Sequence, residues 1–139
     1  KAHRGNLSAA PESSYTGPIN LNEARRMARR GEYGNAILIF EAHLAKKPND
    51  IHAHFELVRY YEDARRIDDA VTHVQRVIHS FDNNDDIWGR AMLGLASLRK
   101  EFEKDEEASA RLLESLIKRM PTPDYARQAR SILKEMRIN

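Results

Sequence analysis

Apolar residues recur along most of the chain every three or four positions, with charged residues between them. This spacing is typical of amphipathic helices that bury one face and expose the other. It predicts seven helices, over residues 20–30, 33–47, 51–64, 67–80, 86–102 and 105–119, and from about residue 123 to the C-terminus. The sequence therefore predicts an all-α protein.

Capping and breaking residues set the expected helix ends. Asn20 and Asp50 are favourable N-caps, and residues 83–85 (Asn-Asn-Asp) predict a turn and a further cap. Gly31 is expected to end the first helix, because glycine adopts the left-handed conformation that terminates helices. Pro48 ends the second helix, since proline disfavours helical geometry in the residue before it.

The predicted helices also repeat along the sequence. Ala36 and Ala70 lie 34 residues apart in helices with the same apolar pattern. The first repeat carries Gly31, Tyr33, Ala36, Phe40, Leu44 and Pro48, and the second carries Arg65, Ile67, Ala70, Val74, Ile78 and Asp82. A third repeat is expected around Trp88 and Met92. Its small residue is expected at Ala108, followed by Leu112 and Leu116, after an insertion of about one helical turn between Lys100 and Glu107.

In their order and spacing, these residues resemble the tetratricopeptide repeat (TPR), a helix-turn-helix unit of about 34 residues. The resemblance covers roughly residues 17–120 and implies an α-solenoid of about three repeats, closed by a C-terminal capping helix. Residues 19–139 would form this repeat domain, and residues 1–18 a flexible arm or linker. The expected core residues are Ala36, Phe40, Leu44, Leu57, Tyr61, Ala70, Val74, Met92, Leu95, Leu112 and Leu116.

Composition agrees with one small helical domain and excludes several classes of site. The chain has 139 residues, of which 41% are hydrophobic and 32% are charged, with a formal net charge of +2. This charge is too small to indicate a polyanion partner. The chain contains no cysteine, so disulfides and thiolate sites are excluded. No apolar run is long enough to span a membrane.

Location in the cell stays open at this point. The chain begins with Lys1 rather than Met, so we expect a processed product or a fragment of a longer protein. Cytoplasm is favoured, with periplasm and attachment to a membrane through an upstream segment as alternatives.

No motif for catalysis, metal binding or cofactor binding stands out. His52 and His54 are two positions apart, and residues at that spacing do not share a helix face. The aspartates near 63–69 and 82–86 are explained by helix caps and dipoles. Phosphate-binding glycine loops and nucleophile motifs are absent from the sequence. We therefore expect a protein that is not an enzyme and carries no metal or cofactor.

The TPR resemblance implies that the first helix of each repeat lines a concave groove. The partner-binding residues expected there are Arg25, Arg29, His52, Phe55, Arg59, Glu62 and Arg90. The arginines favour an acidic peptide or a C-terminal carboxylate, and Phe55 would be an apolar anchor. Alternatively, the arginines pair with Glu56, Glu62 and Asp86 across the groove. The carboxylate clamp of chaperone-binding TPR proteins is not expected, because only Arg90 matches its residues.

The expected function is therefore protein–protein interaction, with a protein or peptide of acidic character as the partner. Two alternatives stay open. The first is self-assembly, in which the apolar face of the first repeat meets another copy of the chain. The second is RNA binding through the basic helix that carries Arg25, Arg26, Arg29 and Arg30. Acidic residues in the same groove disfavour RNA, and no nucleic acid is expected as a partner.

Overall fold

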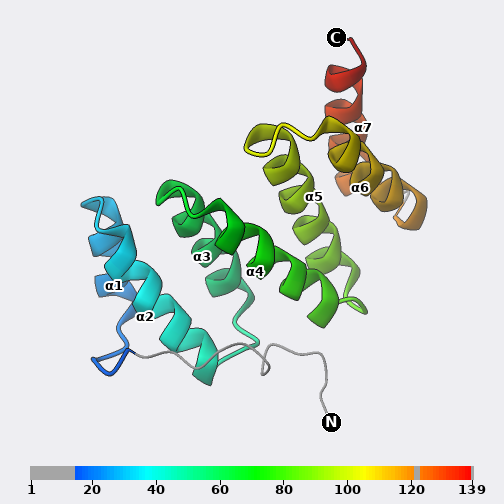
Figure 1. The fold of residues 1–139 in the computed structure, drawn as a ribbon. Helices are drawn as coiled ribbons and strands as arrows, with labels where there is room; N and C mark the ends of the chain where they lie inside the picture. The colour runs from blue at the N-terminus through cyan, green and yellow to red at the C-terminus, as the bar shows by residue number, and fades with distance from the viewer. Residues whose placement is uncertain (1–14, 121–122, 139) are drawn as a thin grey trace. The chain divides into compact units, whose positions relative to one another are not determined.

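The computed structural model describes residues 15–120 and 123–138, and its regular structure is helical throughout these ranges (Figure 1). The helices are α1 (Leu21–Arg29), α2 (Tyr33–Lys46), α3 (Ile51–Asp63), α4 (Ile67–Ser80), α5 (Asp85–Glu101), α6 (Glu106–Arg119) and α7 (Pro123–Ile138). No strand occurs in the described ranges, which confirms the prediction of an all-α chain. The expected N-terminal arm falls mainly on residues 1–14, which lie outside them.

Four helices begin at a side-chain N-cap. The Asn20, Asp50, Asn84 and Asp105 side chains each accept a hydrogen bond from the backbone N–H three residues later, over 3.0, 3.3, 3.1 and 2.9 Å. Each bond satisfies one of the N–H groups that a helix start leaves without an intrahelical partner. The caps therefore confirm the helix starts that the polar residues of the sequence predict.

The helices form two compact units, which divide between Ser80 and Phe81. In the first unit, α2 packs against both α1 and α3, and α3 packs against α4. In the second unit, α6 packs against α5 and α7, with a smaller contact between α5 and α7. Consecutive helices therefore pack side by side within each unit.

Small buried residues lie at the centre of these contacts. Ala36 and Ala70 are fully buried, as predicted, and so are Ala24, Ala91 and Ala96. Larger side chains complete the two cores, among them Ile37, Phe40, Leu57, Val74, Leu98, Leu113 and Leu116. Alanine at a contact allows two helix axes to approach closely, because the distance between helices follows the size of the contacting side chains.

The helices recur with the spacing seen in the sequence. Helices α2 and α4 begin 34 residues apart, at Tyr33 and Ile67. The turns before them also correspond, because Gly31 and Arg65 both have positive φ angles, of 83° and 61°. Glu32 and Arg66 each donate a backbone hydrogen bond, of 2.8 Å, to the carbonyl five residues earlier. Arg65 thus adopts a left-handed conformation that glycine adopts more readily.

The third helical hairpin, α5 with α6, departs from the predicted register. Helix α6 begins 39 residues after α4, because α5 is 17 residues long where α3 has 13 and the following turn gains one more residue. The fully buried small residue is Ser109 rather than the expected Ala108, and Leu113 is buried in place of Leu112. The Ser109 hydroxyl donates a hydrogen bond of 2.9 Å to the Ala96 carbonyl, which satisfies it in the core.

In the second unit, Arg119 and Gly89 make specialised contacts. The Arg119 guanidinium stacks on the Trp88 ring, 3.9 Å from its centroid, and pairs with Asp82 and Asp85 over 3.0 and 3.1 Å.

Gly89 leaves room for α7, since a Cβ atom there would lie 3.0 Å from Tyr125 Cδ2. A methyl group at Gly94, on the same helix, would contact nothing within 4 Å.

A buried histidine pair joins α3 to α4 in the first unit. His54 Nε2 donates to the Pro48 carbonyl over 2.7 Å, because a carbonyl can only accept. His54 Nδ1 therefore accepts from His73 Nε2, 2.8 Å away. Burial, with smaller effects from His54 and Arg76, lowers the pKa of His73 from 6.5 to about 3, and burial also lowers the pKa of His54.

The two glycines of α5 give a matched test of this packing. Both Gly89→Ala and Gly94→Ala gain helix propensity, but only the first forces a side chain against α7. We expect Gly94→Ala to be the more stable variant by at least about 1 kcal/mol. Urea denaturation of both variants measures this difference. Equal stability of the two variants would contradict the close contact at Gly89.

The histidine pair makes the stability of the fold depend on pH. The pKa of His73 is lower in the folded state, so the unfolded state binds more protons and stability falls as the pH drops from 6.5 towards 3. The expected loss over this range is on the order of 4 kcal/mol. Urea denaturation between pH 7.5 and 3 measures it, with His54→Leu/His73→Leu as the comparison. An equally steep decline in that double variant would contradict the assignment to the pair.

Candidate functional site

A groove in the first unit is lined by α1, the first residue of α2, and α3. Its volume is about 300 Å³, and its lining residues are Arg25, Ala28, Arg29, Tyr33, Glu56, Arg59, Tyr60 and Asp63. We call it the arginine groove. It forms because α1 and α3 both pack against α2, which leaves a channel between their outer faces.

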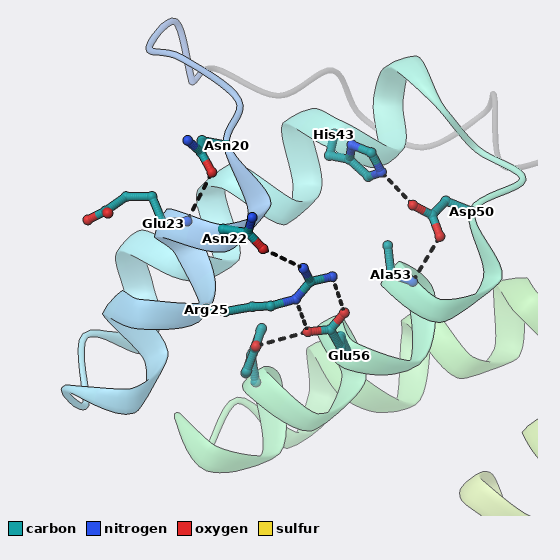
Figure 2. Close-up of polar contacts among 9 residues, drawn as sticks. Asn20, Asn22, Glu23, Arg25, His43, Asp50, Ala53 and Glu56 are labelled. Atoms are coloured by element: carbon teal, nitrogen blue, oxygen red, sulfur yellow. Dashed lines mark hydrogen bonds and ion pairs between the residues drawn. The ribbon is translucent and has the colours of Figure 1, made fainter.

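A hydrogen-bonded salt bridge between α1 and α3 forms part of the groove lining (Figure 2). Arg25 Nε and Nη2 donate to Glu56 Oε2 and Oε1, both over 2.8 Å, in a bidentate arrangement. Arg25 Nη1 donates to Asn22 Oδ1 over 3.2 Å, and the Tyr60 hydroxyl donates to Glu56 Oε2 over 3.2 Å. Both charged groups are therefore engaged within the protein.

Aromatic rings and electrostatics hold this pair in its charged form. The hydrogen bonds from Arg25 lower the pKa of Glu56, and the hydrogen bond to Glu56 raises the pKa of Arg25. Burial, followed by the Glu56 charge, raises the pKa of Tyr60. The Tyr60 ring packs edge-on against Phe40, with centroids 5.2 Å apart, and the Arg25 guanidinium lies 5.8 Å from the Phe40 centroid.

Arg29 and Arg59 line the same groove but differ from Arg25 in their exposure and in their ion pairs. Both are exposed, and neither forms an ion pair with a residue in the described ranges. Arg29 follows Arg25 by one helical turn on α1, and Arg59 follows Glu56 by three residues on α3. The groove thus contains one engaged arginine and two whose guanidinium groups are open to a ligand.

The structure brings together three of the seven predicted binding residues, namely Arg25, Arg29 and Arg59. His52 is exposed, and Phe55 and Glu62 are partly buried, but none of these three is among the lining residues. Burial, followed by the charge of Asp63, raises the pKa of Glu62. Arg90 belongs to the second unit, where it is exposed on α5.

Four further lining residues did not emerge as binding residues from the sequence: Ala28, Tyr33, Tyr60 and Asp63. Tyr33 and Asp63 stand at a helix start and a helix end, where apolar periodicity carries little information. Tyr60 is buried against Phe40, and its hydroxyl donates to Glu56. Helical spacing was an available signal for Ala28, Tyr60 and Asp63, which lie three or four residues after Arg25, Glu56 and Arg59 and therefore on the same helix faces.

Over the described part of the chain, no cluster of three or more histidine, cysteine, aspartate or glutamate side chains is arranged to hold a metal ion. His54, one of the two neighbouring histidines of α3, is buried against His73. Within the same residues, no helix is both long and apolar enough to cross a bilayer. The chemistry that the groove offers is binding by charge and hydrogen bonds.

The chain matches no protein-family model, and no curated protein matches its sequence. The functional argument therefore rests on the arginine groove itself.

A double-mutant cycle tests the salt bridge between Arg25 and Glu56. Arg25→Met and Glu56→Gln each remove one charge, and the double variant removes both. We expect a coupling free energy of about 0.5–1 kcal/mol, towards the upper end for surface pairs because the geometry is bidentate. Urea denaturation of the four proteins measures it. Additive effects of the two substitutions would mean that the pair contributes no stability.

Proposed function

We propose that the chain is a non-catalytic interaction module, built from TPR-like helical hairpins, that binds an acidic peptide segment of a partner protein in the arginine groove. The 34-residue spacing of α2 and α4 supports the repeat architecture, as do the buried alanines at corresponding positions. Helix α7 would be the terminal helix that covers the end of the array. Its buried Ala126, Ala129 and Leu133 and its exposed Arg127 and Arg130 suit that role.

The observation that carries this proposal is the pair of open guanidinium groups in the groove. Arg29 and Arg59 are like charges on two helices that line one groove, and both would attract an anionic group bound between them. A carboxylate fits an arginine in a bidentate geometry, so acidic side chains are the natural ligand chemistry. Asp63 lines the same groove and would repel the closely spaced phosphates of a nucleic-acid backbone, whereas a peptide can present a single carboxylate; this favours a peptide over RNA.

Arg25 has a different role in this proposal from the one its position in the sequence indicates. Its in-plane donors already bind Glu56 and Asn22, so a ligand carboxylate would have to displace an internal partner to reach them. Arg25 instead fixes the distance between α1 and α3, and so positions Arg29 and Arg59. The recognition of the ligand falls to those two arginines.

The test uses random dodecapeptides displayed on phage and selected against the full chain. Selected peptides are expected to share at least one Glu or Asp residue. The variant Arg29→Glu/Arg59→Glu should bind the best of them at least about tenfold more weakly, since two attractive contacts become repulsive. Fluorescence anisotropy of the labelled peptide gives the affinities.

The control is Arg127→Glu/Arg130→Glu, which makes the same change in net charge at exposed residues of α7. Its affinity for the selected peptide should stay within about twofold of the original chain, because exposed charges away from a binding site contribute little. Equal losses in the two double variants would indicate attraction by net charge alone. Unchanged binding by Arg29→Glu/Arg59→Glu would place the binding surface elsewhere.

A further inference from the structure

The arginine groove is built in three successive layers. We assign the layers from the sequence order of the lining residues along the helices: Arg25 with Glu56, which are in contact, then Arg29 with Arg59, then Tyr33 with Asp63. Helices α1 and α3 run in the same direction, because each packs against α2, which runs back between them (Figure 1). The layers therefore follow the sequence order of both walls. From Arg59 to Asp63 the step is about 6 Å, the rise of four helical residues.

The first layer offers no charge to a ligand. Arg25 and Glu56 neutralise each other, and Asn22 and Tyr60 complete their hydrogen bonds. The second layer carries two positive charges, and neither guanidinium forms an ion pair with a described residue. The two side chains that line the groove one turn beyond the salt bridge are therefore both positive.

The third layer carries a negative charge, that of Asp63. Asp63 is exposed, and within the described ranges its carboxylate forms no ion pair or hydrogen bond. Tyr33, the other lining residue assigned to this layer, carries no charge that could neutralise Asp63 at neutral pH. A second acidic residue of a ligand would be repelled in this layer, whereas a lysine or arginine would be attracted.

The spacing of these layers matches one pattern in an extended peptide. Side chains two residues apart point to the same face of an extended chain and lie about 6.7 Å apart, close to the 6 Å step of the groove. Neighbouring side chains point to opposite faces and cannot enter both layers. We propose that the groove recognises an extended segment with an acidic residue and a basic residue separated by one residue, the acid between Arg29 and Arg59 and the base at Asp63. This inference rests on the proposed function and adds the charge order of the ligand.

The probes are four dodecapeptides of Gly and Ser that differ only in their central charged residues. The central segments are Glu-Gly-Lys, Glu-Gly-Glu, Lys-Gly-Lys and the adjacent pair Glu-Lys. Titration of the ¹⁵N-labelled full chain, followed through the amide signals of α1 and α3, gives each dissociation constant. We expect the Glu-Gly-Lys peptide to bind about threefold more tightly than the Glu-Gly-Glu and Glu-Lys peptides, the gain of one exposed ion pair. The Lys-Gly-Lys peptide should bind at least about tenfold more weakly, because its first lysine is repelled by Arg29 and Arg59.

The decisive variant is Asp63→Lys, at an exposed residue at the end of α3, where a positive charge also suits the helix dipole. It should reverse the preference, so that the Glu-Gly-Glu peptide binds about threefold more tightly than Glu-Gly-Lys. The matched control Glu107→Lys makes the same charge change at an exposed residue of α6, outside the groove lining, and should keep the original preference.

The outcomes separate this inference from the proposed function. If Glu-containing peptides bind and Arg29→Glu/Arg59→Glu abolishes binding, but Asp63→Lys leaves the order of affinities unchanged, the charge order is overturned and the acidic-peptide function stands. If no Glu-containing peptide shifts the signals of α1 and α3, both are overturned. A reversal in Asp63→Lys together with an unchanged order in Glu107→Lys establishes Asp63 as the residue that selects the basic position.

Discussion

The close packing of consecutive helices within each unit, at alanine or serine, is the constraint on which the rest of the structure depends. Ala36, Ala70 and Ser109 are each fully buried, and a larger side chain at any of them would push two helices apart. In the first unit this packing holds both α1 and α3 against α2. The distance between α1 and α3 is thereby fixed at a value that Arg25 and Glu56 can span with two hydrogen bonds.

Most of the fold could be predicted from the sequence because its helix ends carry local chemical signals. Asn20 and Asp50 are polar caps that act on their own backbone, and Gly31 ends α1 through a conformation that it adopts easily. The register of α6 could not be predicted in the same way. Ala108 looks like the better core residue, and Ser109 is buried only because the Ala96 carbonyl on another helix accepts its hydroxyl hydrogen. A hydrogen bond between two helices cannot be recognised from the hydrophobic pattern of either helix alone.

The candidate site was only partly predictable, for a related reason. The repeat spacing indicates that Arg25, Arg29 and Arg59 share one surface, and all three line the groove. The sequence left open whether these arginines are paired, and the answer differs between them. Arg25 binds Glu56, 31 residues away in the sequence, whereas Arg29 and Arg59 bind no carboxylate of the described residues. Whether an arginine is paired depends on the distance and orientation of side chains on two different helices. The pattern of charges along one helix does not give that distance or orientation.

The charged side chains of the groove differ in burial. Salt therefore acts differently on the salt bridge between α1 and α3 and on the two exposed arginines. The Glu56 side chain is 18% exposed and accepts a hydrogen bond from Tyr60, so dissolved ions screen its bond to Arg25 only weakly. Arg29 and Arg59 are exposed, and the field they project into solvent fades over about 8 Å at physiological ionic strength. If the groove binds an acidic ligand as proposed, rising salt would weaken that binding well before it weakened the salt bridge between the helices. Ionic strength would then control the occupancy of the groove reversibly, with the helical framework unchanged.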